Sequence, residues 1–208
     1  VVDTLRQQRE ANPSLTARVT RIKQHQSNRF AKTYRDLLQS KRYQPAAAFF
    51  LQELYGPQAF KQRDEQFGRV VPTLVRLFPN QLQQVLHDLA TLHALSEQLD
   101  TDMAACIGEE TLDQAGYAAA WRRCGQPNAR RQQVELTLRV GQALERLTRS
   151  RMLRSALRMM RAPAKAAHVM ELQQVLESGF NAFAGMNGSA EFLSAIEQRE
   201  SEFAKAQF

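Results

Sequence analysis

The apolar residues of this chain recur at steps of three and four residues over most of its length. The first such run follows Asn12-Pro13, and an Asn cap with Pro at the first helical position is typical of a helix start. The run predicts an amphipathic helix of about seven turns. Its apolar positions are Leu15, Val19, Ile22, Phe30, Tyr34, Leu37 and Leu38.

Further runs with the same period follow as far as the C-terminal end. The predicted helices cover 58–78 with a kink or break near Pro72, 80–103, a segment from a Thr111 capping box to Gly125, 127–147, 150–161, 164–183, and a last segment after Ser189. No stretch shows the strict alternation that is typical of a half-buried strand. The sequence therefore predicts an all-α fold.

Residues 45–55 differ from the other helical segments because their apolar groups point around most of the helix. Pro45 suits the first helical position, and Gly56-Pro57 is a typical stop signal. A helix that is apolar on more than one side is normally surrounded by others. We therefore expect a single-domain bundle of about eight helices around a short, buried central helix at 45–55.

The length of 208 residues fits one large domain, which can bury roughly 70% of its unfolded surface without a metal or a disulfide. Residues 1–11 are mostly polar, and we expect them to form a frayed N-terminal arm. Residues 12–208 are then a single helical domain. The chain contains no apolar run of the length that a membrane span needs.

The segment from Phe49 to Pro57 reads Phe-Phe-Leu-Gln-Glu-Leu-Tyr-Gly-Pro and is followed by Arg63-Asp64 and by Val70-Val71-Pro72. It resembles a family of uncharacterised bacterial helical proteins that share a Phe-Phe-Leu-x-x-Leu-Tyr-Gly-Pro signature. The resemblance extends from the first long helix to the C-terminal end. It implies a bacterial, cytoplasmic protein, and it assigns no role to any residue.

Charge is distributed unevenly along the chain. The net charge is +7, yet residues 77–121 contain no Lys or Arg and carry seven acids. Such asymmetry indicates either a basic face for an anionic partner or charge complementarity between helices of the same molecule.

The most prominent basic feature lies between Glu145 and Glu171, where no acid occurs. Arg151, Arg154, Arg158 and Arg161 step by three, four and three residues and so share one side of a helix. Such a ridge can bind phosphates, an anionic membrane surface or an acidic protein groove. It can also be a solvated face, or it can dock on the acidic 77–121 segment. The candidate anion-binding or partner-binding residues are Arg146, Arg149, Arg151, Arg154, Arg158, Arg161 and Lys165.

Aromatic residues give a second set of candidates. Phe49, Phe50, Tyr55 and Trp121 could line a pocket for an apolar ligand such as an acyl chain or haem, although such residues usually form the core. Two function hypotheses follow from these two sets. The first is a non-enzymatic interaction or regulatory module whose basic ridges dock an acidic protein or a nucleic acid. The alternative is a helical carrier or sensor that encloses a small apolar molecule.

The sequence contains no motif typical of a catalytic or cofactor site. We find no nucleophile elbow, no phosphate-binding glycine loop and no Glu-x-x-His pair of the kind that binds metals in helical bundles. Cys106 and Cys124 are expected to be reduced thiols rather than a disulfide. Arg122 and Arg123 could lower the pKa of Cys124 or simply solvate a helix end. We therefore assign no catalytic residue, no metal ligand and no cofactor, and we favour a non-enzymatic protein.

Overall fold

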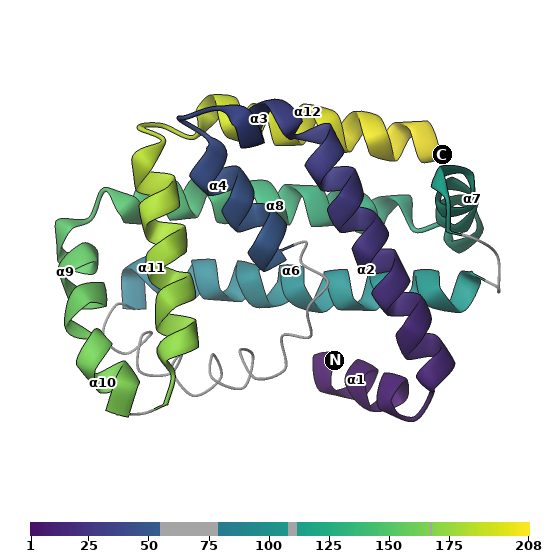
Figure 1. Ribbon diagram of the computed structural model, residues 1–208, viewed down its shortest axis with the longest axis horizontal. Helices are drawn as coiled ribbons and strands as arrows, with labels where there is room; N and C mark the ends of the chain where they lie inside the picture. Colours follow the sequence, from purple (N-terminus) through teal and green to yellow (C-terminus); the bar gives the residue numbers. More distant parts are fainter. Residues whose placement is uncertain (55–78, 108–111, 167) are drawn as a thin grey trace.

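A computed structural model describes residues 1–54, 79–107, 112–166 and 168–208, and these residues form helices with no strand. The predicted all-α, single-domain bundle is confirmed. Figure 1 shows the elements, which are α1 (Val2–Glu10), α2 (Pro13–Thr33), α3 (Arg35–Gln39), α4 (Gln44–Phe49), η1 (Phe50–Leu54), α6 (Pro79–Cys106), α7 (Gln114–Cys124), α8 (Pro127–Thr148), α9 (Arg151–Met159), α10 (Arg161–Ala166), α11 (Met170–Gly185) and α12 (Ala190–Gln207).

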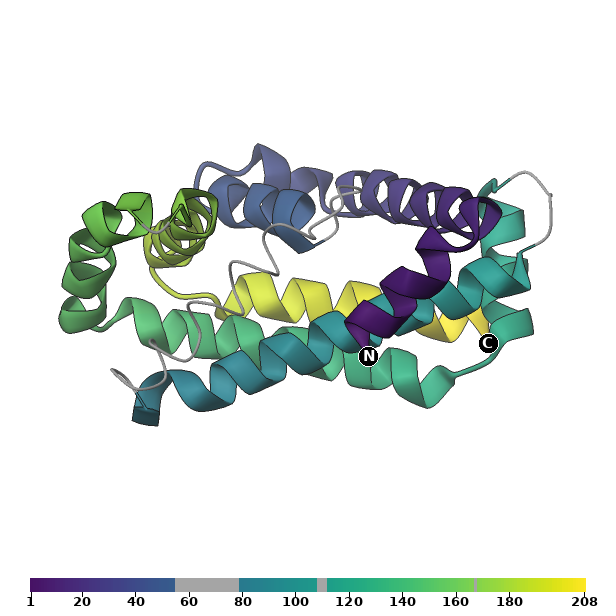
Figure 2. The ribbon, with the colours of Figure 1, turned by 90° about the horizontal axis from the view of Figure 1, so that it is seen from below.

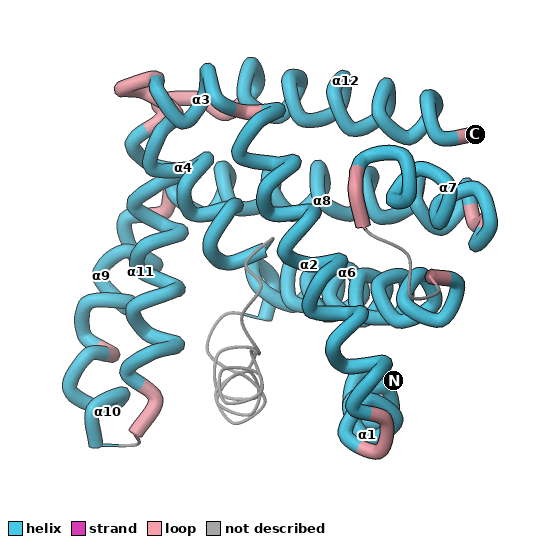
Figure 3. The backbone as a smooth tube through the Cα atoms, turned by 45° about the vertical axis from the view of Figure 1, so that its right-hand side comes forward, coloured by secondary structure: helices cyan, strands magenta, loops and turns pink. Residues whose placement is uncertain are grey.

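The helices form two layers, which are seen edge-on in Figure 2. One layer contains α6, α8 and α12 lying side by side, with α8 antiparallel to the other two (Figure 1). The second layer contains α2, α3, α4 and α11, of which α2, α4 and α11 cross the first layer at a steep angle. Helices α9 and α10 lie at one end of the bundle beside α11, whereas α7 lies at the opposite end (Figure 3).

Several helix ends fall where the local sequence predicts them. The Asn12 side chain accepts a hydrogen bond from the Leu15 N–H, and the Ser150 hydroxyl accepts one from the Leu153 N–H. Helix α7 ends at Gly125, whose φ of +70° is a conformation that favours glycine. These ends depend on neighbouring residues only, so they can be read from short motifs.

Other boundaries differ from the prediction. The first long helix is interrupted at Tyr34, which separates α2 from α3. Helix α9 ends at Met159, shortly before Pro163 as predicted, and Pro163 itself lies in the first turn of α10, where no backbone N–H is needed. The helix predicted at 164–183 is interrupted near His168, which has a φ of +55°. Residue 113, rather than Thr111, caps α7, and Thr111 itself lies outside the described residues.

The N-terminal segment also differs from the prediction. Instead of a frayed arm, residues 2–10 form α1, which packs on α6 and α2. Leu5 is buried, and the Arg9 side chain reaches α6. Charge pairing, which the apolar pattern does not reveal, attaches this mostly polar helix to the bundle.

The segment predicted as a buried central helix buries one face only. Ala46, Ala47 and Phe50 are buried, whereas Gln44 and Pro45 are exposed. The α-helix ends at Phe49 and continues as the π-helical turn η1, and Tyr55 and Gly56 lie outside the described residues. This segment is therefore part of the second layer, not the centre of the bundle.

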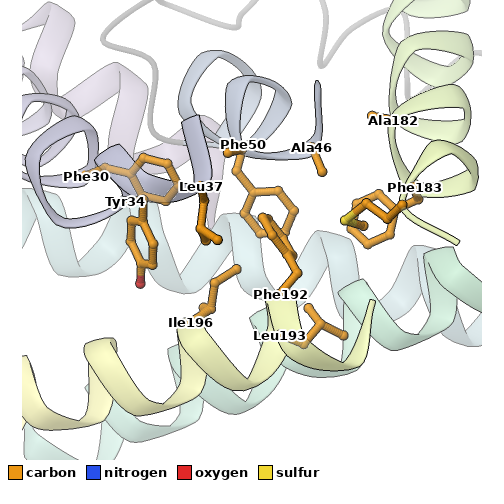
Figure 4. Packing of buried hydrophobic residues seen from close by; sticks show 12 residues of the cluster. Phe30, Tyr34, Leu37, Ala46, Phe50, Ala182, Phe183, Phe192, Leu193 and Ile196 are labelled. Carbon is orange, nitrogen blue, oxygen red and sulfur yellow. The ribbon is translucent and has the colours of Figure 1, made fainter. Parts of the chain in front are cut away.

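Phe50 nevertheless lies at the centre of the largest described apolar cluster (Figure 4). Its ring contacts the Phe192 ring of α12 edge-on, with centroids 5.4 Å apart, and lies 6.0 Å from the ring of Phe183 on α11. Helix α4 also approaches α11 closely at Gly179, where an added Cβ would lie 2.7 Å from the Phe49 ring. The two layers are therefore joined by aromatic packing around Phe50.

We predict that Phe50→Ala lowers the free energy of unfolding by about 3–5 kcal/mol, as expected for a buried aromatic side chain. Phe50 is 1% exposed, whereas Met159 is 72% exposed, so Met159→Ala is the control and should change stability little. Urea unfolding of both variants measures the difference. Equal midpoints for Phe50→Ala and the parent protein would show that the contacts of Phe50 do not hold the layers together.

Candidate functional site

The acidic residues of α6 are bound by cations of α1 and α2. Glu97 lies between Arg9, whose Nη1 is 2.5 Å from Oε2, and Lys23, whose Nζ contacts Oε1. Arg9 also donates hydrogen bonds to the Glu97 carbonyl oxygen and to the Thr101 hydroxyl. Glu97 therefore links three helices at a buried position.

The charge state of Glu97 follows from this arrangement. Burial alone would raise the pKa of the Glu97 carboxyl, but the charges and hydrogen bonds of Lys23 and Arg9 outweigh burial and lower it. Glu97 is therefore ionised in the folded protein at neutral pH.

Three other acids of α6 have partners far from α9 and α10. Asp100 accepts a hydrogen bond from the Gln26 amide, Asp88 pairs with Arg139, and Asp102 accepts a hydrogen bond from Gln126. The basic ridge consequently does not dock on Glu97, Asp100 or Asp102. Glu109 and Glu110, also in the acidic segment, lie outside the described residues.

The predicted basic ridge is exposed. Arg151, Arg154 and Arg158 extend from the outer side of α9, and Leu153 and Leu157 on its inner side pack against Phe180. The remaining candidates are also exposed, and they lie at the end of α8 and on α10: Arg146, Arg149, Arg161 and Lys165. The structure thus brings all seven candidates to one end of the bundle (Figure 1).

Only part of this basic surface is neutralised by neighbouring acids. Arg149 pairs with Glu145 at 2.6 Å, and Arg161 pairs with Glu177 at 2.5 Å. The hydrogen bond from Arg161 lowers the pKa of the Glu177 carboxyl. Within the described ranges, the other five candidates, Arg146, Arg151, Arg154, Arg158 and Lys165, form no ion pair with a carboxylate.

Exposed methionines accompany the arginines of α9. Met152 is 59% exposed and Met159 is 72% exposed, which is unusual for large apolar side chains. Both lie on the helix that carries Arg151, Arg154 and Arg158. The surface of α9 therefore combines cationic and apolar groups.

The apolar-pocket candidates are not brought together. Phe50 belongs to the cluster between α4, α11 and α12, with Phe49 packed against it, whereas Trp121 belongs to a second cluster between α2, α6 and α7. Tyr55 lies outside the described residues. An open hollow of about 430 Å³ on the surface of α6, lined by Ala90, Ala94 and Leu95 among others, includes none of these candidates.

A smaller cavity of about 40 Å³ lies where α2, α7, α8 and α12 meet. Its lining combines apolar groups with polar and charged ones, and it includes Arg29, Trp121, Arg130 and Glu200. We did not expect a site at Arg130 from the sequence. Helical spacing in the sequence does indicate that Arg130 points inward, however. Arg130 comes four residues before Val134 and shares the inward side of α8 with Val134, Thr137 and Gly141.

The two cysteines lie beside each other at the ends of α6 and α7. Burial, together with a hydrogen bond to Cys106, raises the pKa of the Cys124 thiol to about 12. Arg122 and Arg123 are exposed, and Arg123 donates a hydrogen bond to the Cys106 carbonyl oxygen. The suggestion that these arginines activate Cys124 is therefore wrong, since burial outweighs them.

Metal-binding geometry is not found in the part of the chain that the structure describes, which contains no group of three His, Cys, Asp or Glu side chains able to hold an ion. None of the described helices combines the length and apolar character needed to cross a bilayer.

These features define an all-α, single-domain bundle with a basic end and a small cavity, lined in part by charged residues, at the opposite end. The chain belongs to the family described as "Domain of unknown function (DUF8198)", which matches residues 5–208. No curated protein and no solved structure matches it. Membership agrees with the expected resemblance to an uncharacterised family.

We predict that Glu97→Gln destabilises the fold by about 3–5 kcal/mol, because it leaves Arg9 and Lys23 buried without their anion. Glu135→Gln, the same change at an exposed position of α8, should be nearly neutral. Because the pKa of Glu97 is lowered by folding, its contribution is complete above the unfolded value of about 4.5 and is lost as pH falls through the folded value. The melting temperatures of both variants and of the parent protein, measured from pH 7 to pH 3, test this prediction. If Glu97→Gln is destabilised relative to the parent protein as much at pH 3 as at pH 7, the prediction is wrong.

We also predict that Cys124 reacts slowly with a disulfide reagent, since the thiolate is the reactive form. In a Cys106→Ser background at pH 8, the folded protein should react roughly a hundredfold more slowly than the protein in urea. The rate should still rise with pH above pH 9, because burial, the largest cause of the raised pKa of Cys124, remains when Cys106 is replaced. A rate that levels off near pH 9 would show an ordinary, accessible thiol.

Proposed function

We propose that this chain is a non-enzymatic bacterial interaction module that docks an acidic protein on the surface of α9 and α10. The observation that carries the proposal is the combination, on the exposed surface of one helix, of Arg151, Arg154 and Arg158 with Met152 and Met159 beside them.

The arginines supply long-range attraction. Together with Arg146 and Lys165 they are exposed cations with no carboxylate partner among the described residues, so their field is available to a partner. Exposed charges of this kind raise the rate of association with an oppositely charged surface and fix its orientation. They contribute little to the stability of the free protein.

The methionines favour a protein over a nucleic acid as the partner. Arg and Met are both enriched in protein–protein interfaces, and Met side chains adapt to irregular apolar surfaces. A phosphate backbone would pair with the arginines but would leave the methionine side chains without apolar contacts. An acidic groove with an apolar floor uses both kinds of group.

The test uses a fluorescent amphipathic peptide with Glu and Leu in helical register, and a duplex DNA of 24 base pairs as the competing class, both at about 150 mM salt. We expect the peptide to bind more tightly than the DNA. Arg151→Gln/Arg154→Gln/Arg158→Gln should weaken peptide binding at least tenfold while leaving the melting temperature nearly unchanged.

A second variant separates the two partner classes. Met152→Ala/Met159→Ala should weaken binding of the peptide by about threefold to tenfold, because apolar contacts are lost, and should leave any DNA binding unchanged. If DNA binds more tightly than the peptide, and if the methionine substitutions do not change DNA binding, the partner is instead a nucleic acid. Absence of binding to either probe would remove the basis of the proposal.

A further inference from the structure

The cavity of about 40 Å³ between α2, α7, α8 and α12 is independent of the basic surface of α9 and α10. At roughly 10–15 Å³ for each water, it holds about three waters, or an anion of three or four heavy atoms. Gln26, Gln133 and Val134 at its edge are only half-buried, so a small solute can enter from solvent.

Arg130 is a buried cation that forms no ion pair with a carboxylate of the described residues. It is 6% exposed, and its hydrogen bonds to described residues are long contacts to neutral acceptors, 3.4 Å to Gln133 Oε1 and 3.8 Å to Met103 Sδ. Its guanidinium carbon lies 4.3 Å from the centre of the Trp121 ring. A guanidinium has five N–H donors, so most of the donors of Arg130 lack a good acceptor.

Trp121 provides a second unused donor beside Arg130. Its side chain is 7% exposed, and its buried Nε1–H makes no hydrogen bond of good geometry to any described residue, although the Tyr117 hydroxyl interacts with it. A buried N–H without an acceptor costs free energy comparable to a lost hydrogen bond. Two kinds of donor in one cavity therefore lack acceptors.

Neighbouring polar groups are already engaged. Gln26 donates to Asp100, Gln133 donates to Ser96, and the Thr137 hydroxyl donates to the Gln133 carbonyl oxygen. The carboxylate of Glu200 accepts two hydrogen bonds from Arg29 and one from Tyr34. Glu200 is thus neutralised by other groups and contributes little repulsion to an anion in the cavity.

The charged residues that line the cavity do not balance. The cations are two and the carboxylate is one: Arg29 and Arg130 against Glu200. The lining therefore has an excess of one positive charge. The nearby carboxylate of Asp100 also attracts Arg130, but burial raises the pKa of Asp100 and so disfavours its ionised form.

We propose that the cavity binds one small, planar, singly charged oxyanion, of the class of nitrate, bicarbonate and formate. The anion accepts hydrogen bonds from the Arg130 guanidinium and the Trp121 indole N–H and neutralises the excess charge. Charge-assisted hydrogen bonds of this kind are among the strongest in proteins. The size of the cavity excludes larger organic anions.

Trp121 is the only tryptophan of the chain, so its emission reports directly on the cavity. We would titrate the protein with sodium nitrate, bicarbonate and formate, each at constant ionic strength maintained with sodium gluconate. We expect a saturable change in emission and a rise in melting temperature for at least one of the three anions. The anion that binds most tightly identifies the ligand within this class.

Matched variants assign the binding to Arg130. Arg130→Gln should weaken it at least tenfold, whereas Arg131→Gln removes the same charge from an exposed neighbour and should leave it unchanged. The Arg151→Gln/Arg154→Gln/Arg158→Gln variant should also bind the anion normally, which separates this site from the proposed docking surface.

Quenching that is linear in anion concentration, with a melting temperature that does not respond to any of the three anions, would overturn the proposal. If Arg130→Gln does not fold, crystals of the unaltered protein soaked in sodium bromide decide the matter. An anomalous peak between Arg130 and the Trp121 Nε1 supports the site, and water alone at that position overturns it.

Discussion

The structure depends on the pairing of an acidic helix with cations that come from other helices. Helix α6 has no Lys or Arg of its own, so its buried carboxylates require partners from elsewhere. Glu97 obtains them from α1 and α2, and this pairing determines how both helices lie on α6. Buried ion pairs add little net stability compared with apolar packing, but they penalise every arrangement in which one partner is left alone.

This pairing determines which charges remain available for function. Helices α1 and α2 supply the cations for α6, so the arginines of α9 at the far end keep their exposure. Within the described part of the bundle, Arg130 is left without an ion pair to a carboxylate. The proposed protein-docking surface and the proposed anion site therefore have a common origin in the uneven distribution of charge along the chain.

The features that could be predicted from the sequence depend on near neighbours. The caps at Asn12 and Ser150 and the end of α7 at Gly125 involve residues within one turn. The exposed arginine series of α9 follows from helical spacing in the same way. The ordered α1 could not be predicted, because Arg9 pairs with Glu97, which is 88 residues away in the sequence. The cavity at Arg130 could not be predicted either, because its lining comes from four helices. Periodicity shows which side of a helix is apolar, but not which distant charge lies opposite it.

The contact between α2 and α12 has a consequence for how the molecule forms. Glu200 accepts hydrogen bonds from Arg29 and Tyr34, which are up to 171 residues away in the sequence. Phe192 and Ile196 pack in the same apolar cluster as Phe30. Until α12 has left the ribosome, a nascent chain exposes these aromatic groups and an unpaired arginine. Native contacts this distant in sequence slow folding because loop closure must precede them. The emergence of α12, rather than the formation of the first helices, is then the step after which this protein can complete its core.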